Sequence, residues 1–262
     1  MYKLKGEPSM KYDVKPCRIL YKREIAQGIF DFLLDAEDFA KAAKPGQFVH
    51  ILVPGKTLRR PISICDIDAE AGTLRIVFQI RGEGTEILSQ MKIGDHMDVL
   101  APLGNGFDLG DTNRKALFVG GGIGVPPLLG AAKKFGKNAT VAVGFRNKDT
   151  AILEADFARA GCRVFVATDD GSMGHHGLVI DCAKDVEADV IFACGPTPML
   201  KAVCALAKER GIPCQISLEE RMACGIGACL GCATPLLRED GTQYFGHVCK
   251  DGPVFDYTKV VL

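Results

Sequence analysis

The stretch MACGIGACLGC, residues 222–232, decides how the rest of this chain is interpreted. It places Cys224, Cys229 and Cys232 at C-x4-C-x2-C spacing, and Cys249 follows in CKDGPVF. This spacing is typical of a plant-type [2Fe–2S] site. Three thiolates from one short loop can surround a small cluster, and the glycines in the loop let backbone N–H groups approach the inorganic sulfurs. The four cysteines therefore predict an electron carrier.

A structural zinc site and a disulfide framework are the alternatives for these cysteines. Zinc sites usually contain two C-x2-C pairs, and here only Cys229 and Cys232 are so spaced. A chain of 262 residues with 47% hydrophobic residues can bury a core without cross-links. We expect the other cysteines to be mostly inert small apolar residues, namely Cys17, Cys65, Cys162, Cys182, Cys194, Cys204 and Cys214.

Composition limits the partners and the compartment. The formal net charge is +0, so no basic excess is present to neutralise nucleic-acid phosphates, and no nucleic-acid partner is expected. The 11 cysteines, without a signal-like N-terminal segment, favour a reducing compartment, and we expect a cytoplasmic protein. The apolar run over 116–132 is interrupted by glycines and prolines, so no membrane span is expected.

Two kinds of periodicity predict a multidomain fold. Over residues 14–108, short β-rich runs alternate with Gly, Pro and Asp turns, which predicts an antiparallel β-barrel with one short helix over 85–91, capped by a hydroxyl residue. After residue 111, apolar strands alternate with helical stretches at 126–135, 154–160 and 198–210, which predicts an α/β domain with a parallel sheet. We place the barrel domain at 1–110, the α/β domain at 111–215 and a small C-terminal [2Fe–2S] domain at 216–262.

Two turns at the ends of predicted parallel strands have the composition of dinucleotide-binding loops. One is a GGGIG turn that leads directly into a helix, so that its backbone and the helix N-terminus can hold a pyrophosphate. The other is a Cys-Gly-Pro turn at the same edge of the sheet, where open α/β sheets bind ligands. A Gly-rich turn by itself is also common as tight packing. The residues concerned are Gly120, Gly121, Gly122, Gly124, Cys194, Gly195 and Pro196.

Asp169 and Asp170 follow a third predicted strand, RVFVATD, and could accept hydrogen bonds from a ribose. Their charge would repel a 2′-phosphate, so they favour NAD over NADP. Paired aspartates beside a glycine are equally common as an ordinary solvated turn.

Two segments of the predicted barrel could hold an anionic ligand. Arginine presents a rigid multi-donor fork to phosphate, and a Gly-x-Gly-Thr turn places N–H groups at a helix start. A solvated barrel edge and a hairpin turn are the alternatives. The candidate residues are Arg60, Pro61, Ile62 and Ser63 in the first segment, and Gly82, Gly84 and Thr85 in the second.

The order of these motifs, Arg-Pro-x-Ser, Gly-x-Gly-Thr, GGGIG and Cys-Gly-Pro, resembles the ferredoxin reductase superfamily of flavin enzymes. With MACGIGACLGC and CKDGPVF added, the chain closely resembles the family of electron-transfer subunits of bacterial NAD-dependent dihydroorotate dehydrogenases. The resemblance spans most of the chain. It therefore extends to all three predicted domains.

The resemblance implies FAD in the barrel and NAD in the α/β domain. Arg60 would contact the flavin phosphates, Ser63 would bond near the reactive flavin nitrogen, and the Gly82–Thr85 turn would surround the pyrophosphate. The GGGIG turn would line NAD, Cys-Gly-Pro would approach the nicotinamide, and Asp169 or Asp170 would approach the ribose. Many superfamily members carry tyrosine where this chain has Ile62, so an aromatic stack on the flavin is absent there.

The resemblance also implies a partner and a direction of electron flow. An FMN-containing catalytic subunit would oxidise dihydroorotate in pyrimidine biosynthesis, and electrons would reach NAD+ through the cluster and FAD, in a heterotetramer. No acid–base residue is expected to be essential here, because no proton is removed from carbon in this chain. The loop with Arg221, Met222 and Ile226 is expected to face the partner, unless Met222 and Ile226 only pack the loop.

Two other functions remain open from the sequence. Related reductase subunits serve glutamate-synthase-like flavoproteins, transhydrogenases or hydrogenases. An all-cysteine ligand set favours the dihydroorotate system over transhydrogenase subunits, where an acidic ligand is expected. A redox sensor is the second alternative, but a sensor needs no hydride donor, and two predicted dinucleotide sites argue against it.

Overall fold

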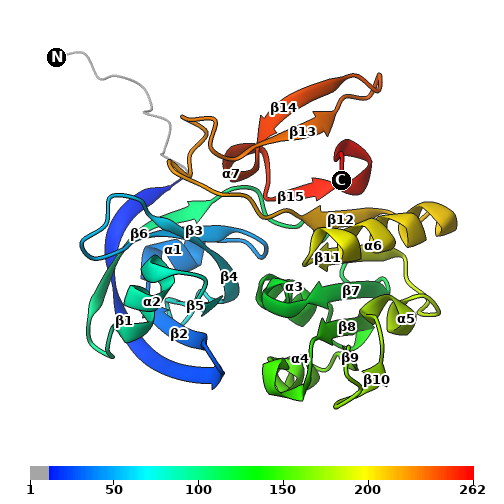
Figure 1. The fold of residues 1–262 in the computed structure, drawn as a ribbon, viewed down its shortest axis with the longest axis horizontal. Helices are drawn as coiled ribbons and strands as arrows, with labels where there is room; N and C mark the ends of the chain where they lie inside the picture. The colour runs from blue at the N-terminus through cyan, green and yellow to red at the C-terminus, as the bar shows by residue number, and fades with distance from the viewer. Residues whose placement is uncertain (1–11) are drawn as a thin grey trace.

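The computed structural model describes residues 12–262, and the N-terminal part of that range is a closed six-stranded antiparallel barrel (Figure 1). Residues 1–11 of the predicted first domain lie outside the described range. The barrel confirms the prediction from the alternating β-rich runs. Its strand order is β1-β2-β5-β4-β3-β6, with β1 (Asp13–Ala26), β2 (Ile29–Asp35), β3 (Phe48–Leu52), β4 (Arg60–Asp68), β5 (Thr73–Gln79) and β6 (His96–Leu103).

Strand β3 shows how the barrel divides its side chains between two cores. Val49 and Ile51 are fully buried inside the barrel with Ile62 of β4. Phe48 points the other way and packs with the C-terminal part of the chain. This follows from the period of two in a strand, which sends alternate side chains to opposite faces. The outer face of β3 is therefore buried as well.

The helices of the barrel differ in part from expectation. Helix α2 (Glu83–Gln90) begins before Thr85, and no side chain caps it. The Thr85 hydroxyl instead accepts a hydrogen bond from the Arg81 N–H at 2.8 Å and donates one to the Gly82 carbonyl at 2.9 Å. The predicted hydroxyl cap is thus wrong, because Thr85 already lies in the first turn. Helix α1 (Glu37–Ala42) was not predicted, being only 6 residues long.

The middle of the chain forms a seven-stranded sheet in the order β10-β9-β8-β7-β11-β12-β15. All its pairs are parallel except β12 with β15. The α/β prediction is confirmed. The strands are β7 (Ala116–Gly121), β8 (Ala139–Phe145), β9 (Arg163–Thr168), β10 (His175–His176), β11 (Val190–Cys194), β12 (Cys214–Ser217) and β15 (Val254–Asp256); the helices are α3 (Pro126–Phe135), α4 (Glu154–Arg159), α5 (Val179–Ala183) and α6 (Thr197–Arg210).

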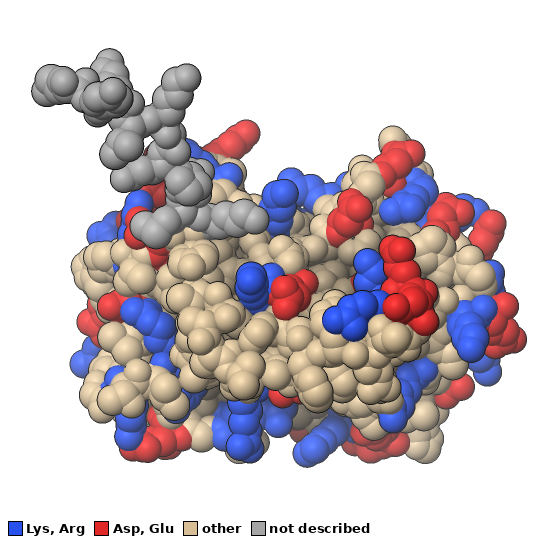
Figure 2. Space-filling view, turned by 90° about the horizontal axis from the view of Figure 1, so that it is seen from above, with Lys and Arg blue, Asp and Glu red and all other residues tan. Residues whose placement is uncertain are grey.

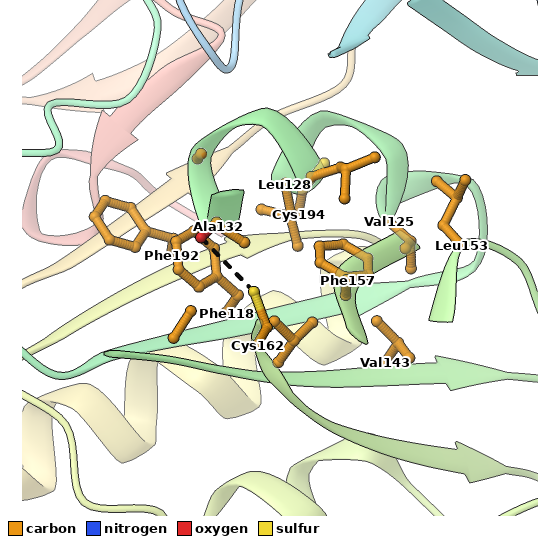
Figure 3. Close-up of a cluster of buried hydrophobic side chains, with 14 of the residues drawn as sticks. Phe118, Val125, Leu128, Ala132, Val143, Leu153, Phe157, Cys162, Phe192 and Cys194 are labelled. Carbon is orange, nitrogen blue, oxygen red and sulfur yellow. Dashed lines mark hydrogen bonds between the residues drawn. The ribbon is translucent and has the colours of Figure 1, made fainter. Parts of the chain in front are cut away.

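Helices cover both faces of this sheet. Phe118 and Phe192, on neighbouring strands, stack with ring centroids 4.9 Å apart beneath α3 and α4. Figure 3 shows this core, including the Cys162 thiol that donates to the Ala132 carbonyl at 3.7 Å. Leu117 and Val119 face the opposite core with α5 and α6. Such two-sided burial explains the continuous apolar runs of the strands.

The C-terminal part adds a hairpin and one strand to this framework. After β12 the chain crosses back above the barrel, then forms β13 (Ala233–Leu237), β14 (Gln243–His247) and α7 (Val248–Asp251) before it returns to the sheet as β15 (Figure 1). The predicted division at residue 215 falls within β12. Because β15 pairs with β12, the C-terminal part is attached directly to the sheet. Within residues 12–262, no helix is both long and apolar enough to cross a bilayer.

An ion-pair network joins the barrel to the α/β domain. Arg75 of β5 donates to both oxygens of Asp31 at 2.9 and 2.8 Å, and to Asp156 of α4 at 2.7 Å. The Asp31 side chain is only 7% exposed. A carboxylate buried to this extent depends on its cation, so Arg75 stabilises the domain contact.

Replacing Arg75 by methionine should lower the free energy of unfolding by about 3 kcal/mol, because Asp31 would remain buried without its cation. Urea unfolding of the cofactor-loaded subunit measures this change. Lys41→Met is the control, since it removes only the exposed pair with Glu37 and should leave the free energy of unfolding nearly unchanged. Equal losses in both variants would contradict a structural role for the Arg75 network.

Candidate functional site

The four cysteines of the C-x4-C-x2-C motif and its distant partner converge at the junction of the three parts of the chain. Cys232 and Cys249 are buried, with their sulfurs 3.2 Å apart. Cys224 and Cys229 are half-buried, and the Cys229 thiol lies close enough to lower the pKa of Cys224. The sulfurs thus form two pairs. Two pairs of thiolates suit a cluster with two irons, each of which needs two protein ligands.

Backbone N–H groups of the loop point at these sulfurs. Gly227 donates to the Cys249 sulfur at 3.1 Å, and Ala228 donates to the Cys224 sulfur at 3.3 Å. Gly225 and Gly227 adopt φ values of 74° and 78°, which L side chains rarely adopt. The glycines therefore give the loop a shape that turns its donors inward, as stabilisation of thiolates and bound sulfide requires.

The pKa values of Cys224 and Cys249 are shifted in opposite directions by their surroundings. Burial acts to raise the pKa of Cys224, but the N–H groups of Ile226 and Ala228 and the Cys229 side chain outweigh it and lower the pKa to about 6. Burial and the adjacent Cys232 thiol raise the pKa of Cys249 to about 12. Two thiols this close in a buried site do not both ionise unless a cation lies between them. The donor set therefore fits an iron–sulfur cluster.

The candidate flavin residues come together at the rim of the barrel. Gly84 lies so close to Arg60 that a Cβ atom there would be 2.6 Å from Nε. Arg60 donates to the carbonyls of Leu58 and Arg59 at 3.0 and 3.2 Å, which fixes its guanidinium beside the start of α2. Fixed guanidinium donors beside a helix N-terminus suit a phosphate.

The other candidate flavin residues differ in their accessibility. Pro61 and Ser63 are half-buried on β4, whereas the Ile62 side chain is buried inside the barrel. Ser63 pairs with Phe48 and Pro61 pairs with His50 across the β3–β4 ladder. Gly82 has open space around its Cα, and Thr85 is nearly buried with its hydroxyl already bonded. Among Pro61, Ile62, Ser63, Gly82 and Thr85, the polar groups left for a ligand are therefore the Ser63 hydroxyl and the backbone groups, beside the guanidinium of Arg60.

The two predicted dinucleotide turns meet because β7 and β11 are neighbouring parallel strands. A Cβ atom on Gly124 would lie 2.5 Å from the Cys194 carbonyl, and one on Gly121 would lie 2.9 Å from the Pro196 ring. A Cβ atom on Gly195 would likewise lie very close to the backbone nitrogen of Gly121. Gly120 packs under Val125, and Gly122 faces open space. Glycine is therefore required for the two turns to lie against each other.

A cavity of about 660 Å³ opens in front of these turns. The barrel contributes Ile29, Gln79 and Arg81 to its wall, and the C-terminal part contributes Glu219. The remaining wall comes from the α/β domain, including Gly121, Gly122, Gly124, Arg146, Thr150, Asp169, Leu178, Gly195, Pro196 and Met199. All three parts of the chain thus enclose one elongated space.

The two aspartates after β9 differ in availability. Asp169 lines the cavity. Asp170 accepts hydrogen bonds from the Ser172 N–H at 2.9 Å and hydroxyl at 2.6 Å, which lower its pKa. The Asp170 carboxylate therefore stabilises its own turn, and Asp169 is the better placed of the two to meet a ligand. Cys194 is buried, and burial raises its pKa to about 12, so its thiol is neutral.

Sequence reasoning missed several residues around these sites. Arg81 adjoins the Gly-x-Gly-Thr turn, and that position could have identified it. Leu178 and Glu219 carry no recognisable pattern and enter the cavity only through the tertiary fold. His50, within the apolar run QFVHILV, is fully buried between the barrel, where it pairs with Pro61, and the cluster loop, where it contacts Gly225. Burial lowers the pKa of His50 to about 4, and the nearby Arg59 acts in the same direction.

Comparison with known proteins agrees with this geometry. The family model described as "Oxidoreductase FAD-binding domain" matches residues 17–107. The model described as "Iron-sulfur cluster binding domain of dihydroorotate dehydrogenase B" matches residues 219–261. The two matched regions contain the barrel rim and the four cysteines.

Curated relatives match the chain over nearly its whole length. The "Dihydroorotate dehydrogenase B (NAD(+)), electron transfer subunit" of Streptococcus mutans serotype c is 46% identical over 93% of this chain and 96% of that protein. The protein of the same name from Caldanaerobacter subterraneus subsp. tengcongensis is 43% identical over 94% of this chain and 97% of that protein.

Solved structures show the same architecture. The structure titled "Insights into flavin-based electron bifurcation via the NADH-dependent reduced ferredoxin-NADP oxidoreductase structure" has a TM-score of 0.82 and 34% identity, covering 94% of this chain and 89% of that one. The ferredoxin reductase of carbazole 1,9a-dioxygenase has a TM-score of 0.67 at 20% identity, over 79% of this chain and 68% of that one. The second likeness concerns the fold alone.

A flavin-binding barrel, a parallel α/β domain and a four-cysteine iron–sulfur domain define a flavin- and iron–sulfur-dependent oxidoreductase subunit. Within that class, the chain belongs to the family of electron transfer subunits of dihydroorotate dehydrogenase B (NAD(+)). The resemblance inferred from the sequence is thereby confirmed.

Replacing Arg60 by alanine should weaken FAD binding about 30-fold, because a charge-assisted phosphate contact contributes about 2 kcal/mol. Fluorescence titration of deflavinated protein with FAD measures this affinity. Arg18→Ala is the matched control, since this exposed arginine of β1 pairs only with Asp35 among the ion pairs of the described chain. Unchanged affinity in Arg60→Ala would contradict a phosphate contact at this residue.

Proposed function

We propose that this chain transfers electrons from a dihydroorotate-oxidising partner, which contains FMN, to NAD+. The observation that supports the proposal is the meeting of the barrel, the α/β domain and the four-cysteine part of the chain. Cys232 and Cys249 belong to one buried core with residues of the barrel and the sheet, and all three parts of the chain line the cavity, which supports neighbouring cofactor sites. When bound, FAD exchanges hydride with nicotinamide and single electrons with an iron–sulfur cluster.

The chain's own residues act by binding and positioning. We assign the cluster to Cys224, Cys229, Cys232 and Cys249, and the flavin phosphates to Arg60 and the N–H groups at the start of α2. The close Gly121, Gly124 and Gly195 turns hold the dinucleotide in the cavity, and Asp169 accepts from its ribose. Buried neutral Cys194 contributes shape and excludes water beside this cavity. No residue of the chain is required to move a proton to or from carbon.

The surface around the cluster is suited to a protein partner. Leu230, next to the cluster ligand Cys229, is 78% exposed, and Phe245 of β14 is 74% exposed. On the face with this hairpin, basic and acidic side chains are interspersed with uncharged ones (Figure 2). Met222 and Ile226 pack against the core, whereas Arg221 is exposed. Exposed apolar residues beside a redox centre favour a docking surface, on which we place the catalytic subunit of a heterotetramer.

The proposal includes the compartment and the boundaries of the domains. We place the chain in the cytoplasm, because none of its 11 cysteines forms a disulfide and a reducing environment keeps cysteines in that state. We retain the domain divisions at 110/111 and 215/216 for the flavin, NAD and cluster functions.

A second function is favoured by the structural likeness to the NADH-dependent reduced ferredoxin-NADP oxidoreductase. That protein shares 34% identity with this chain at a TM-score of 0.82. A partner of the transhydrogenase type would use the same three sites with another acceptor. The all-cysteine ligand set favours the first function, and the substrate of the partner separates the two.

Anaerobic NADH formation from dihydroorotate tests the main proposal. The chain co-purified with its native partner should form NADH, whereas the partner alone and the pair supplied with NADP+ should not. Cys224→Ser should abolish this turnover but leave NAD binding intact, because serine oxygen is a poor ligand for a soft iron–sulfur centre. Cys204→Ser is the control, since this half-buried cysteine lies on α6, outside the cluster loop. Activity of the partner alone, or full turnover in Cys224→Ser, would contradict the proposal.

The preference for NAD can be tested at the two aspartates. Asp169→Ala should weaken NAD binding and reduce the ratio of NAD to NADP affinity by about tenfold, the usual effect of losing a hydrogen bond to a charged group. Isothermal titration with both dinucleotides measures the ratio. Asp170→Ala should leave the ratio unchanged, because that carboxylate is bonded to Ser172. The reverse pattern would assign the ribose to Asp170.

A further inference from the structure

His50 occupies an unusual position on the outer face of β3. Its neighbours Val49 and Ile51 fill the barrel, while Phe48, on the same face as His50, packs with Cys232 and Cys249. The His50 residue is 0% exposed. Its imidazole is therefore enclosed between the barrel wall and the domain that carries the cluster.

Both ring nitrogens of His50 are buried without a hydrogen-bond partner within the described part of the chain. Polar backbone groups of Arg59 and Cys224 lie beside the ring and favour its protonated form, as carbonyl oxygens do, but neither reaches hydrogen-bond geometry. Leaving a buried polar group unpaired is costly, so a purely apolar side chain would stabilise the fold better here. Packing alone therefore does not explain why this buried position holds a histidine.

One side of the ring contacts the cluster loop. Gly225, the residue after the first cysteine ligand, lies so close that a Cβ atom there would be 2.5 Å from His50 Nδ1 and 3.2 Å from Cε1. Gly225 is also in the left-handed region, with φ of 74°. The backbone of the loop therefore rests directly on the imidazole.

The backbone of His50 also contacts the segment that contains the Arg-Pro-x-Ser motif. His50 pairs with Pro61 across the β3–β4 ladder, and its carbonyl accepts from Arg59 Nη1 at 3.1 Å. Arg59 is itself held by Asp98, with Nη2 to Oδ1 at 2.7 Å. His50 is thus bonded to Arg59 and paired with Pro61 at the Arg-Pro-x-Ser motif, and it also contacts the loop that follows Cys224.

We propose that His50 is a positioning residue that fixes the cluster loop against the flavin-binding strands and so sets the rate of electron transfer between the two centres. The inference rests on the proposed placement of FAD at Arg60 and of the cluster at the four cysteines. The imidazole of His50 joins β3, beside the Arg-Pro-x-Ser segment, to the Cys224–Gly225 backbone through the contacts described above. A small displacement of either segment would change the separation of the two centres.

The test uses the subunit in complex with its native partner, loaded with FAD and cluster. Excess NADH would reduce the bound flavin by hydride under anaerobic conditions, and the cluster would receive electrons one at a time only through the flavin. Stopped-flow absorbance follows the bleaching of the flavin and of the cluster separately. His50→Phe retains an aromatic ring without nitrogens, and His50→Gln retains a polar side chain. His96→Phe is the matched control, because His96 is an exposed residue at the start of β6.

In His50→Phe, flavin reduction should keep its wild-type rate while cluster reduction slows by roughly tenfold or more, since small displacements of positioned groups have large kinetic effects. The electron paramagnetic resonance spectrum of the reduced cluster and its midpoint potential should shift, because the backbone donors to its sulfurs move. His50→Gln should show a smaller change, and His96→Phe none. Unchanged cluster reduction, spectrum and potential in His50→Phe would overturn the proposal.

Gly225→Ala perturbs the same contact from the opposite side and serves if His50→Phe does not fold. Its Cβ atom must displace the imidazole, so the same slow cluster reduction and altered spectrum are expected. Wild-type behaviour in Gly225→Ala would overturn the proposal. A wild-type complex whose cluster NADH does not reduce would instead contradict the proposed function, which keeps the two failures distinct.

Discussion

The packing of the cluster loop onto the barrel and the sheet is the contact on which the rest of the structure depends. Cys232 and Cys249 belong to the same core as Phe48 of the barrel and Val119 of the parallel sheet. Two of the predicted cluster ligands thereby share a core with elements from all three parts of the chain. Because interiors are close-packed and resist deformation, a shared core keeps the sites at constant separation. A carrier of single electrons needs that rigidity more than it needs reactive side chains.

A second feature common to the predicted sites is a glycine that lies very close to another segment of the chain. Gly84 admits Arg60, Gly124 admits the Cys194 carbonyl, and Gly225 admits His50, each at a distance that a Cβ atom would forbid. In each pair, one segment contains a predicted cofactor motif and the other positions it. The glycines therefore do more than permit turns, because they set the distances between neighbouring functional segments. Some of the 30 glycines of the chain therefore allow close packing between segments at the predicted sites.

Charge pairs hold the domains together, whereas apolar side chains are exposed near the four cysteines. Arg75 neutralises Asp31 and Asp156 between the barrel and the α/β domain. Around the cluster, by contrast, the exposed residues include Leu230 and Phe245. An ion-pair network between domains of one chain restricts their motion, whereas apolar residues on a surface favour association with another protein. The same molecule therefore has a fixed internal interface and an external one suited to a partner.

The sequence by itself determined the sites that are built from contiguous residues. The C-x4-C-x2-C loop, the GGGIG turn and the alternating strands were all recognisable because ligand spacing and side-chain periodicity are local properties. Tertiary structure alone decided that Asp169 lines the cavity while Asp170 bonds its own turn, that Leu178 and Glu219 enter the wall, and that Thr85 lies inside its helix. It also decided that His50, which in sequence is one residue of an apolar strand, is buried against Gly225. Such properties depend on which backbone approaches which, and that follows from packing between segments far apart in the chain.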